Sequence, residues 1–143
     1  VDLQGGKKIS VKMGSYGIGV SRLVAAIIEA KFNNNIMKWP LSVSPYEVAI
    51  IPMISKNDNS NLIKSQKIYK ELIKHNIDVL LDDTDENISA KIKKFNLIGI
   101  PYQIIIGQKS EGDIFEFKEI DKESQNLSID KVVQKLTKEK NSI

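Results

Sequence analysis

The feature that most constrains the fold of this chain is a regular alternation of two hydrophobic patterns between residue 46 and its C-terminal end. Short apolar runs such as "YEVAIIPMI" (46–54) are typical of buried strands. They alternate with amphipathic segments such as 59–76, whose inward face would carry Ile68, Tyr69, Leu72 and Ile73. Strands that alternate with helices favour an α/β fold, because a helix is the usual connection between parallel strands.

The remaining elements extend this alternation to the end of the chain. The patterns predict strands over 77–83, 101–107 and 112–119, and helices over 87–97 and 128–140, the last capped by Ser128. The strand pair between 101 and 119 has no helix between its members and would make the sheet mixed. The expected fold is therefore α/β, a mixed sheet flanked by helices.

A break in the pattern separates this region from the first part of the chain. The stretch "KWPLSVSPYE" (38–47) contains Pro40 and Pro45, which bias the residues before them away from helix. We therefore expect one unit over 1–40, a linker over 41–45 and a second unit over 46–143. Trp39 would anchor the linker against the larger body to which the first unit belongs.

The first unit resembles a piece of a larger body. Gly5 and Gly6 predict a hairpin turn, followed by a strand with Ile9, Val11 and Met13 on one face. From Val20 the apolar residues follow helical spacing and cover nearly the whole circumference of the predicted helix. Such a helix suits burial in more protein than these residues supply, and we expect the natural start to lie upstream of Val1.

Composition excludes some classes of site. The sequence has no cysteine and one histidine, which rules out disulfides and thiolate metal sites and argues against histidine-based metal centres. No apolar run approaches the roughly 18 residues that a membrane span needs. Residues 1–45 carry six basic and two acidic side chains, and residues 46–143 carry fifteen basic and sixteen acidic ones. Charge alone therefore does not indicate a nucleic-acid-binding surface on the second unit.

The stretch "KMGSYGIGVSR" (12–22) holds three closely spaced glycines, Gly14, Gly17 and Gly19, and the only arginine of the chain, Arg22. Glycines let a ligand or another backbone approach closely. The planar fork of Arg can hold a phosphate by two hydrogen bonds or stack on a purine, which Lys cannot do. The spacing matches neither GxGxxG nor the phosphate-binding loop. The pattern alone favours a structural explanation, a bulged strand with packing glycines and a surface arginine.

Resemblance to a known family changes that balance. The stretch "MGSYGIGVSRLVAAIIE" followed by "WP" resembles motif 3 of class II aminoacyl-tRNA synthetases, in the form used by bacterial-type prolyl-tRNA synthetases. Downstream, "PYEVAIIPM", "IDVLLDD" and "LIGIPYQIIIG" resemble the anticodon-binding domain shared by the prolyl, threonyl, histidyl and glycyl enzymes. The chain is identified as a member of the prolyl-tRNA synthetases, covering the end of the antiparallel catalytic domain (1–40) and the anticodon-binding domain (46–143).

The resemblance implies a role for each residue of the first unit that matches motif 3. Arg22 would be the catalytic residue that packs against the adenine of ATP and reaches its phosphates, with Gly17 and Gly19 flooring that pocket. Gly14, Ser15 and Tyr16 would lie beside the proline pocket, Ser15 standing where the family often has Cys. The implied reaction joins proline to ATP with the help of Mg²⁺ and transfers proline to tRNA(Pro). No residue of this chain is expected to bind a metal.

For the second unit the resemblance implies contacts to anticodon bases. The expected residues are Asp82, Asp83, Glu86, Lys91 and Tyr102. The alternatives left open are a solvated strand end for the two aspartates and a solvated helix face for the lysines, while Phe95 is expected in the core. Thr84 and "NIS" (87–89) depart from the Arg and Pro-Gly that the family tends to carry, so Lys91 or Lys94 would have to supply the missing contacts.

The resemblance further implies tRNA(Pro), proline and ATP as partners, a homodimer, and a cytoplasmic location. Motifs 1 and 2 are absent from these residues, so this piece alone is expected to be inactive. Two other hypotheses remain: a non-catalytic anticodon-domain protein that binds RNA, and an accessory subunit that dimerises through its α/β domain. The retained Arg22 favours the enzyme, because an RNA-binding module has no need of an arginine for ATP.

Overall fold

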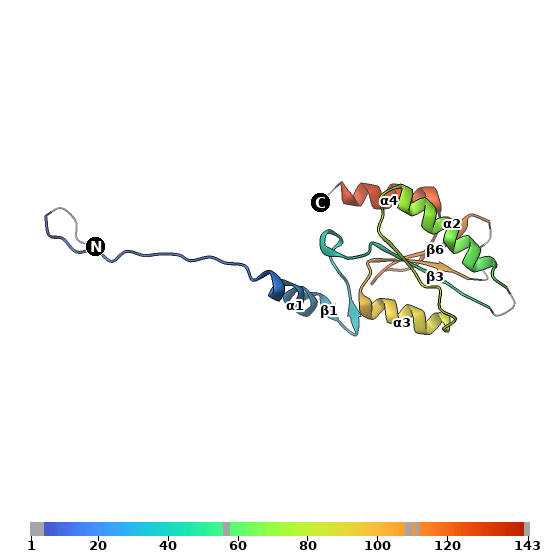
Figure 1. Cartoon of the computed structure of the whole chain (residues 1–143), viewed down its shortest axis with the longest axis horizontal. Coiled ribbons are helices and arrows are strands. Elements are labelled where there is room, and N and C mark those ends of the chain that lie inside the picture. Colours follow the sequence, from blue (N-terminus) through green and yellow to red (C-terminus); the bar gives the residue numbers. More distant parts are fainter. Residues whose placement is uncertain (1–4, 56–57, 108–109, 111, 142–143) are drawn as a thin grey trace.

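The computed structural model describes residues 5–55, 58–107, 110 and 112–141. A five-stranded sheet forms the centre of the C-terminal domain, with helices on both faces (Figure 1). Its strands are β3 (Val48–Pro52), β4 (Val79–Leu81), β5 (Tyr102–Ile106), β6 (Ile114–Glu119) and β7 (Gln125–Ser128). The helices of this domain are α2 (Ser60–Lys74), α3 (Ile88–Ile98) and α4 (Ile129–Lys140). The part before it contains α1 (Val20–Lys31), the short strands β1 (Phe32–Asn33) and β2 (Ile36–Met37), and a 3₁₀ turn (Leu41–Val43).

The sheet is mixed, which confirms the predicted fold class. Its strand order is β4-β3-β5-β6-β7. Strand β3 pairs in parallel with β4 and β5, whereas β6 pairs antiparallel with both β5 and β7. The parallel strands are joined through α2 and α3, as the alternating pattern predicted.

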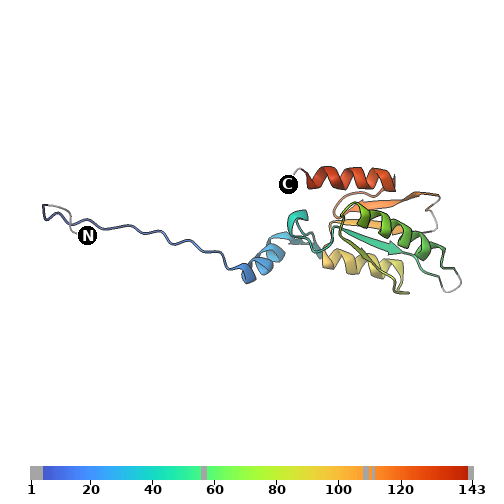
Figure 2. The same cartoon turned by 45° about the horizontal axis from the view of Figure 1, so that its top comes forward.

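The helices cover the two faces of the sheet unequally. Helices α2 and α4 lie on one face and α3 lies on the other (Figures 1 and 2). Val48 and Ile50 of β3 belong to the core on the α2–α4 face, and Ala49 and Ile51 belong to the smaller core under α3. This division follows from the two-residue period of a strand, because successive side chains point to opposite faces. Phe95 of α3 is buried in the smaller core, as expected.

Two predictions for the helices of this domain were wrong in detail. Ile73, expected on the inward face of α2, is 44% exposed, because it lies at the margin of the apolar stripe. Ser128 precedes α4 but its side chain makes no capping hydrogen bond. Ser128 is also the last residue of β7, paired with Ile114 of β6, so the chain passes directly from strand to helix.

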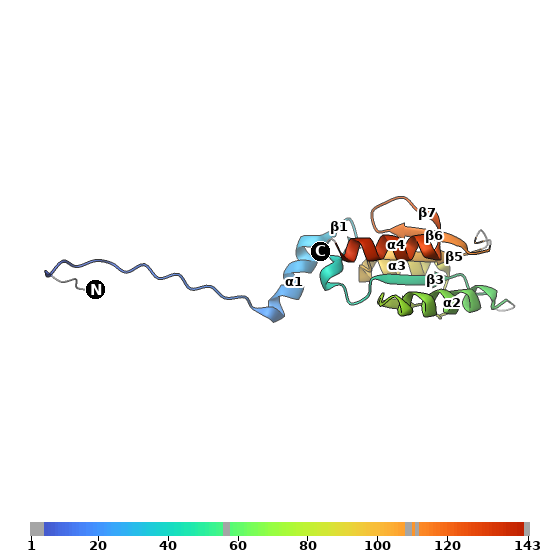
Figure 3. The ribbon, with the colours of Figure 1, turned by 90° about the horizontal axis from the view of Figure 1, so that it is seen from above.

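The hairpin predicted for the N-terminal segment stays a prediction, because its first arm lies outside the described residues. Gly5 and Gly6 do make a turn with positive φ angles, while the arm before them lies outside the described residues. Residues 9–19 form neither helix nor strand and run away from the domain (Figure 3). The predicted strand residues Val11 and Met13 are exposed. Helix α1 forms where it was predicted, although none of its residues is buried.

The segment between α1 and the domain is fastened to the end of α3. Strands β1 and β2 form a small hairpin whose turn residues, Asn34 and Asn35, have positive φ angles. Met37 is buried beneath Gly99, and the Trp39 indole N–H donates to the Ile98 carbonyl at 2.9 Å. The expected contact of Trp39 with a catalytic body stays a prediction. The tryptophan binds the second unit, because the unpaired carbonyls at the C-terminal end of α3 need donors.

Gly99 is the residue on which this attachment depends. It ends α3 in the left-handed conformation with φ of +85°, and an added Cβ would lie 2.6 Å from Met37 Cγ and 2.9 Å from the Met37 carbonyl oxygen. Gly99→Ala is therefore expected to lower the free energy of unfolding by about 1–3 kcal/mol, from backbone strain and the clash with Met37.

Urea unfolding followed by circular dichroism measures this loss, and Gly107→Ala is the matched control. Gly107 has no positive φ, and its added Cβ would meet only Met53 Cε at 3.8 Å, an ordinary contact. Equal stability of the two variants would contradict the role assigned to Gly99.

Candidate functional site

Arg22 lies exposed in the first turn of α1, where its backbone N–H donates to the Gly19 carbonyl at 3.0 Å. Gly19 is the residue before the helix, with extended φ and ψ angles of −81° and 99°. The transition from extended chain to helix therefore presents the guanidinium to the outside of the described structure. An exposed arginine fork at this position can bind a phosphate or stack on a planar ring.

The three glycines before Arg22 differ in what surrounds them. A Cβ on Gly14 would lie 2.9 Å from the ring of Tyr16, which is itself 98% exposed. A Cβ on Gly17 would meet no atom within 4 Å, and one on Gly19 would make only ordinary contacts with the stem of Arg22. Within the described residues, nothing requires glycine at 17 or 19. Ser15 and Tyr16 are exposed beside them, so the six predicted residues of this segment are neighbours in the chain but enclose no pocket with each other.

A second cluster forms where β4 ends and α3 begins. Asp82 is buried, and its Oδ1 accepts hydrogen bonds from the Thr84 backbone N–H at 3.0 Å and from the Thr84 hydroxyl at 2.5 Å. Lys94 Nζ lies 2.8 Å from Asp82 Oδ2 and 3.1 Å from Glu86 Oε2. Lys91 Nζ lies 3.5 Å from Asp82 Oδ1 in the interior. One carboxylate is thus surrounded by two ammonium groups and a hydroxyl.

The ionisation of Asp82 follows from these contacts. Burial raises the pKa of its carboxyl, but the hydrogen bonds from Lys94 and Thr84 and the charge of Lys91 outweigh burial and lower the pKa from 3.8 to about 2. Asp82 is therefore a structural anion at neutral pH. A group with this pKa is unsuited to exchange protons with a substrate at neutral pH.

The structure corrects three of the five residues expected at anticodon bases. Tyr102 is buried, stacks on Phe117 with ring centroids 5.5 Å apart, and donates its hydroxyl to Glu139, so its ring is not available to a base. Lys91 is completely buried and cannot reach a phosphate on the surface. Asp82 is buried as well, which rules out both a solvated strand end and direct contact with a base for this residue.

The other two expected residues remain on the surface. Asp83 and Glu86 are exposed in the loop between β4 and α3, together with Thr84 and Asp85. Sequence reasoning missed that Thr84 supports this loop by its hydrogen bonds to Asp82, although the spacing Asp-x-Thr is a familiar side-chain-to-backbone turn signal. The exposed residues from 83 to 87 are called the acidic loop below.

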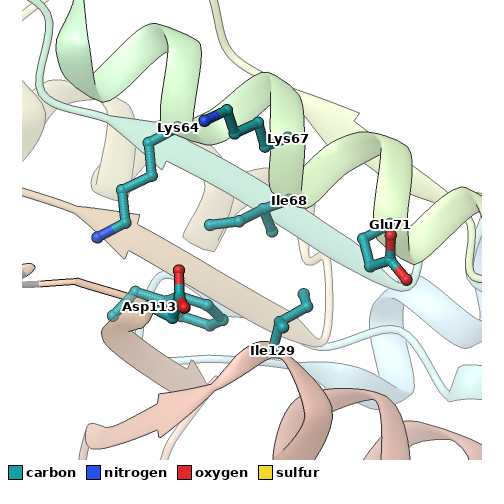
Figure 4. A pocket seen from close by; sticks show the side chains of 7 residues that line it. Lys64, Lys67, Ile68, Glu71, Asp113 and Ile129 are labelled. Carbon is teal, nitrogen blue, oxygen red and sulfur yellow. The ribbon is translucent and has the colours of Figure 1, made fainter.

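A shallow hollow also opens between α2 and the neighbouring β6 and α4 (Figure 4). Its volume is about 280 Å³, and its lining consists of Lys64, Lys67, Ile68, Glu71, Asp113, Phe115 and Ile129. Lys64 is already engaged, because its ammonium donates to the Ser110 carbonyl at 3.0 Å. With two lysines, one glutamate and one aspartate around an apolar floor, the hollow has no single sign of charge with which to select a charged ligand.

Two kinds of feature are absent from the part of the chain that the structure describes. Among the described residues, no group of three or more His, Cys, Asp or Glu side chains is placed to hold a metal ion. Within the same part of the chain, no helix is long and apolar enough to cross a bilayer.

Comparison with known proteins assigns the domain. The family model described as "Anticodon binding domain" matches residues 47–139. The chain belongs to the anticodon-binding domain family. This match covers the whole five-stranded sheet, the acidic loop and the three helices except Lys140, the last residue of α4.

Relatives of known name extend the similarity beyond this domain. The chain is 63% identical over 142 residues to a proline–tRNA ligase of Pelagibacter ubique, with 98% of this chain and 32% of the relative covered. It is 41% identical over 131 residues to a proline–tRNA ligase of Buchnera aphidicola, with 91% of this chain and 22% of the relative covered. The chain thus spans about a third or less of the length of these relatives.

A solved structure with the same fold is the prolyl-tRNA synthetase of Cryptosporidium parvum, determined with L-proline and AMP. The match has a TM-score of 0.73 at 21% identity and covers 82% of this chain and 25% of that protein. At this identity the likeness supports the fold of the anticodon-binding domain.

Asp82 gives a pH prediction. Because its folded-state pKa is lowered, its ionisation stabilises the fold above pH 4 and this contribution is lost as the pH falls through about 2. The lowering corresponds to about 2 kcal/mol. We expect Asp82→Asn to destabilise the chain at pH 6 by about 3–5 kcal/mol, because Lys91 loses its buried partner. The difference from wild type should narrow by about 2 kcal/mol by pH 2.

Urea titrations between pH 6 and pH 2 measure both quantities. Asp83→Asn, a change of the exposed neighbour, is the control and should leave a small and nearly constant difference from wild type. An Asp82→Asn difference that stays the same at every pH would contradict the assigned ionisation.

Proposed function

We propose that this chain is the C-terminal part of a proline–tRNA ligase, an ATP-dependent enzyme that activates proline and transfers it to tRNA(Pro). The observation that carries the proposal is the 63% identity to such a ligase over 142 residues, which runs through the Arg22 segment as well as the anticodon-binding domain. A protein that only bound RNA would need the domain but not the segment.

In this proposal Arg22 serves ATP. Its exposed guanidinium, at the start of α1, would stack on the adenine and hold a phosphate in the transition state of proline activation, where negative charge is rearranged at the α-phosphate. Gly17 and Gly19 would leave room for the nucleotide to approach the backbone. This would explain why both positions are glycine, although no contact among the described residues requires it. Gly14, Ser15 and Tyr16 would border the proline pocket, the Tyr16 ring resting over Gly14.

Among the described residues no group of three or more His, Cys, Asp or Glu side chains is placed to hold an ion. Any magnesium would accompany ATP as part of the substrate, and no step is assigned here to an ion held by this chain. The side chains of the first unit would bind and orient ATP and proline, and Arg22 would place its positive charge beside the reacting phosphate.

The anticodon-binding domain would bind tRNA(Pro) through the acidic loop, where Asp83 and Glu86 are exposed. Carboxylates accept hydrogen bonds from the amino groups of bases. Since residues 46–143 carry fifteen basic and sixteen acidic side chains, recognition would depend on base contacts more than on net charge. The exposed apolar residues of α1 would be covered by the rest of a cytoplasmic, homodimeric enzyme.

The test is proline-dependent exchange of pyrophosphate into ATP, measured with the longer protein that contains this chain. Arg22→Lys is expected to lower exchange by about 100-fold or more, because Lys keeps the charge but loses the planar fork. Lys31→Arg, at the exposed end of the same helix, is the control and should leave exchange unchanged.

Each result has a distinct meaning. If the Arg22→Lys variant retains proline-dependent exchange, the protein is still a ligase but Arg22 does not serve ATP. Binding of tRNA(Pro) without exchange would overturn the proposal in favour of a non-catalytic RNA-binding protein.

A further inference from the structure

Lys91 is a charged residue with no exposed surface at all. It projects from the first turn of α3, and its ammonium donates to three backbone carbonyls, at 3.2 Å to Pro52, 3.4 Å to Asp82 and 2.5 Å to Thr84. An ammonium has three protons. These three carbonyls can take all of them, so a group that is costly to bury is satisfied where it lies.

The partners of Lys91 come from two stretches of the chain, the end of β3 and residues 82–84 after β4. Pro52 is the last residue of β3, Asp82 follows β4, and Thr84 lies within the acidic loop. The Asp82 backbone N–H still donates to Ile50 of β3 at 3.0 Å, so Asp82 extends the sheet by one residue. Lys91 thus ties the start of the acidic loop to the carboxyl edge of the sheet.

The other bonds of the loop complete this attachment. The Asp82 carboxylate accepts from the Thr84 N–H and hydroxyl, so Thr84 is held through its amide by Asp82 and through its carbonyl by Lys91. At the far end, the Asn87 side chain accepts from the Ser89 N–H at 2.9 Å and caps α3. Asp85 and Glu86 lie between these two fixed points, and Glu86 also accepts a hydrogen bond from Lys94 at 3.1 Å.

We propose that Lys91 is a positioning residue for RNA recognition, fixing the backbone of the acidic loop so that its carboxylates meet the amino groups of unpaired bases. The inference rests on the proposed function, since it takes tRNA as the ligand. It assigns Lys91 no contact with RNA, because the side chain is sealed in the interior. Lys91 affects discrimination between bases because it fixes the position of the Thr84 backbone. The carboxylates of the loop make the hydrogen bonds to the bases.

A buried positioning residue and a surface phosphate contact differ in salt dependence. Loss of a phosphate contact lowers the slope of log affinity against log salt concentration by about one, whereas loss of a positioning residue leaves the slope unchanged. Loss of a positioning residue also lowers the discrimination between bases, whereas loss of a phosphate contact weakens binding to all sequences alike.

The experiment uses Lys91→Met in the longer protein, because Met fills a similar volume without charge. Aminoacylation and binding are measured with a tRNA(Pro) transcript and with transcripts in which each anticodon base is replaced in turn. We expect discrimination between them to fall about tenfold. The salt slope and proline-dependent exchange should equal those of wild type. Lys93→Met is the matched control, removing a lysine two positions away on the exposed side of α3.

Two results would overturn the proposal. One is unchanged discrimination in a folded Lys91→Met protein, and the other is a salt slope reduced by about one. If Lys91→Met fails to fold, the double variant Asp82→Asn, Lys91→Met removes both buried charges together and is measured instead. Absence of exchange in the wild type would instead mark failure of the proposed function, so the two failures are distinguishable.

Discussion

Burial of β3 on both faces is the constraint on which the rest of this structure depends. All five of its residues are buried, and the first four divide between the core under α2 and α4 and the core over α3. Because β4 and β5 run parallel to β3, their carboxyl ends are brought to the same edge of the sheet. The end of β3 at Pro52 and the residue after β4, Asp82, therefore face one region, and it is there that α3 supplies Lys91. A site at this edge is a consequence of the parallel order.

The charges at that edge would be unfavourable in any other arrangement. Removing an ammonium and a carboxylate from water costs several kcal/mol per ion, and mutual attraction offsets this only when the remaining hydrogen-bonding groups are satisfied. Lys91 meets the condition through three carbonyls, and Asp82 meets it through Thr84 and Lys94. The exposed acidic loop contains no apolar anchor of its own. Its shape is instead set by these buried ions, which connects the packing of α3 to the surface proposed to bind RNA.

The two ends of the chain are stabilised in different ways. The anticodon-binding domain buries two cores of its own, whereas α1 buries no residue and presents apolar side chains to the outside. The junction between them belongs physically to the domain, because Met37 is buried beneath Gly99 and Trp39 binds the end of α3. Gly99, in its left-handed conformation, thus ends α3 and packs against Met37, in the segment that connects the domain to α1 and Arg22. The direction in which α1 leaves the domain depends on this contact.

The sequence by itself determined the strands and helices that have a clear hydrophobic periodicity, such as β3 and the face of α2 that carries Ile68 and Leu72. It also indicated that the sheet is mixed. It did not reveal β7, because "QNLS" is polar and becomes a strand only through its pairing with β6. Residue type also suggested surface roles for Lys91, Asp82 and Tyr102, since lysine, aspartate and a tyrosine hydroxyl are usually solvated. Only the tertiary structure decided that all three are interior. Thr84, the nearby partner of Asp82 and Lys91, is within reach of a local pattern, but Pro52 and Glu139 lie 39 and 37 residues from Lys91 and Tyr102, and these groups meet only when the sheet has formed.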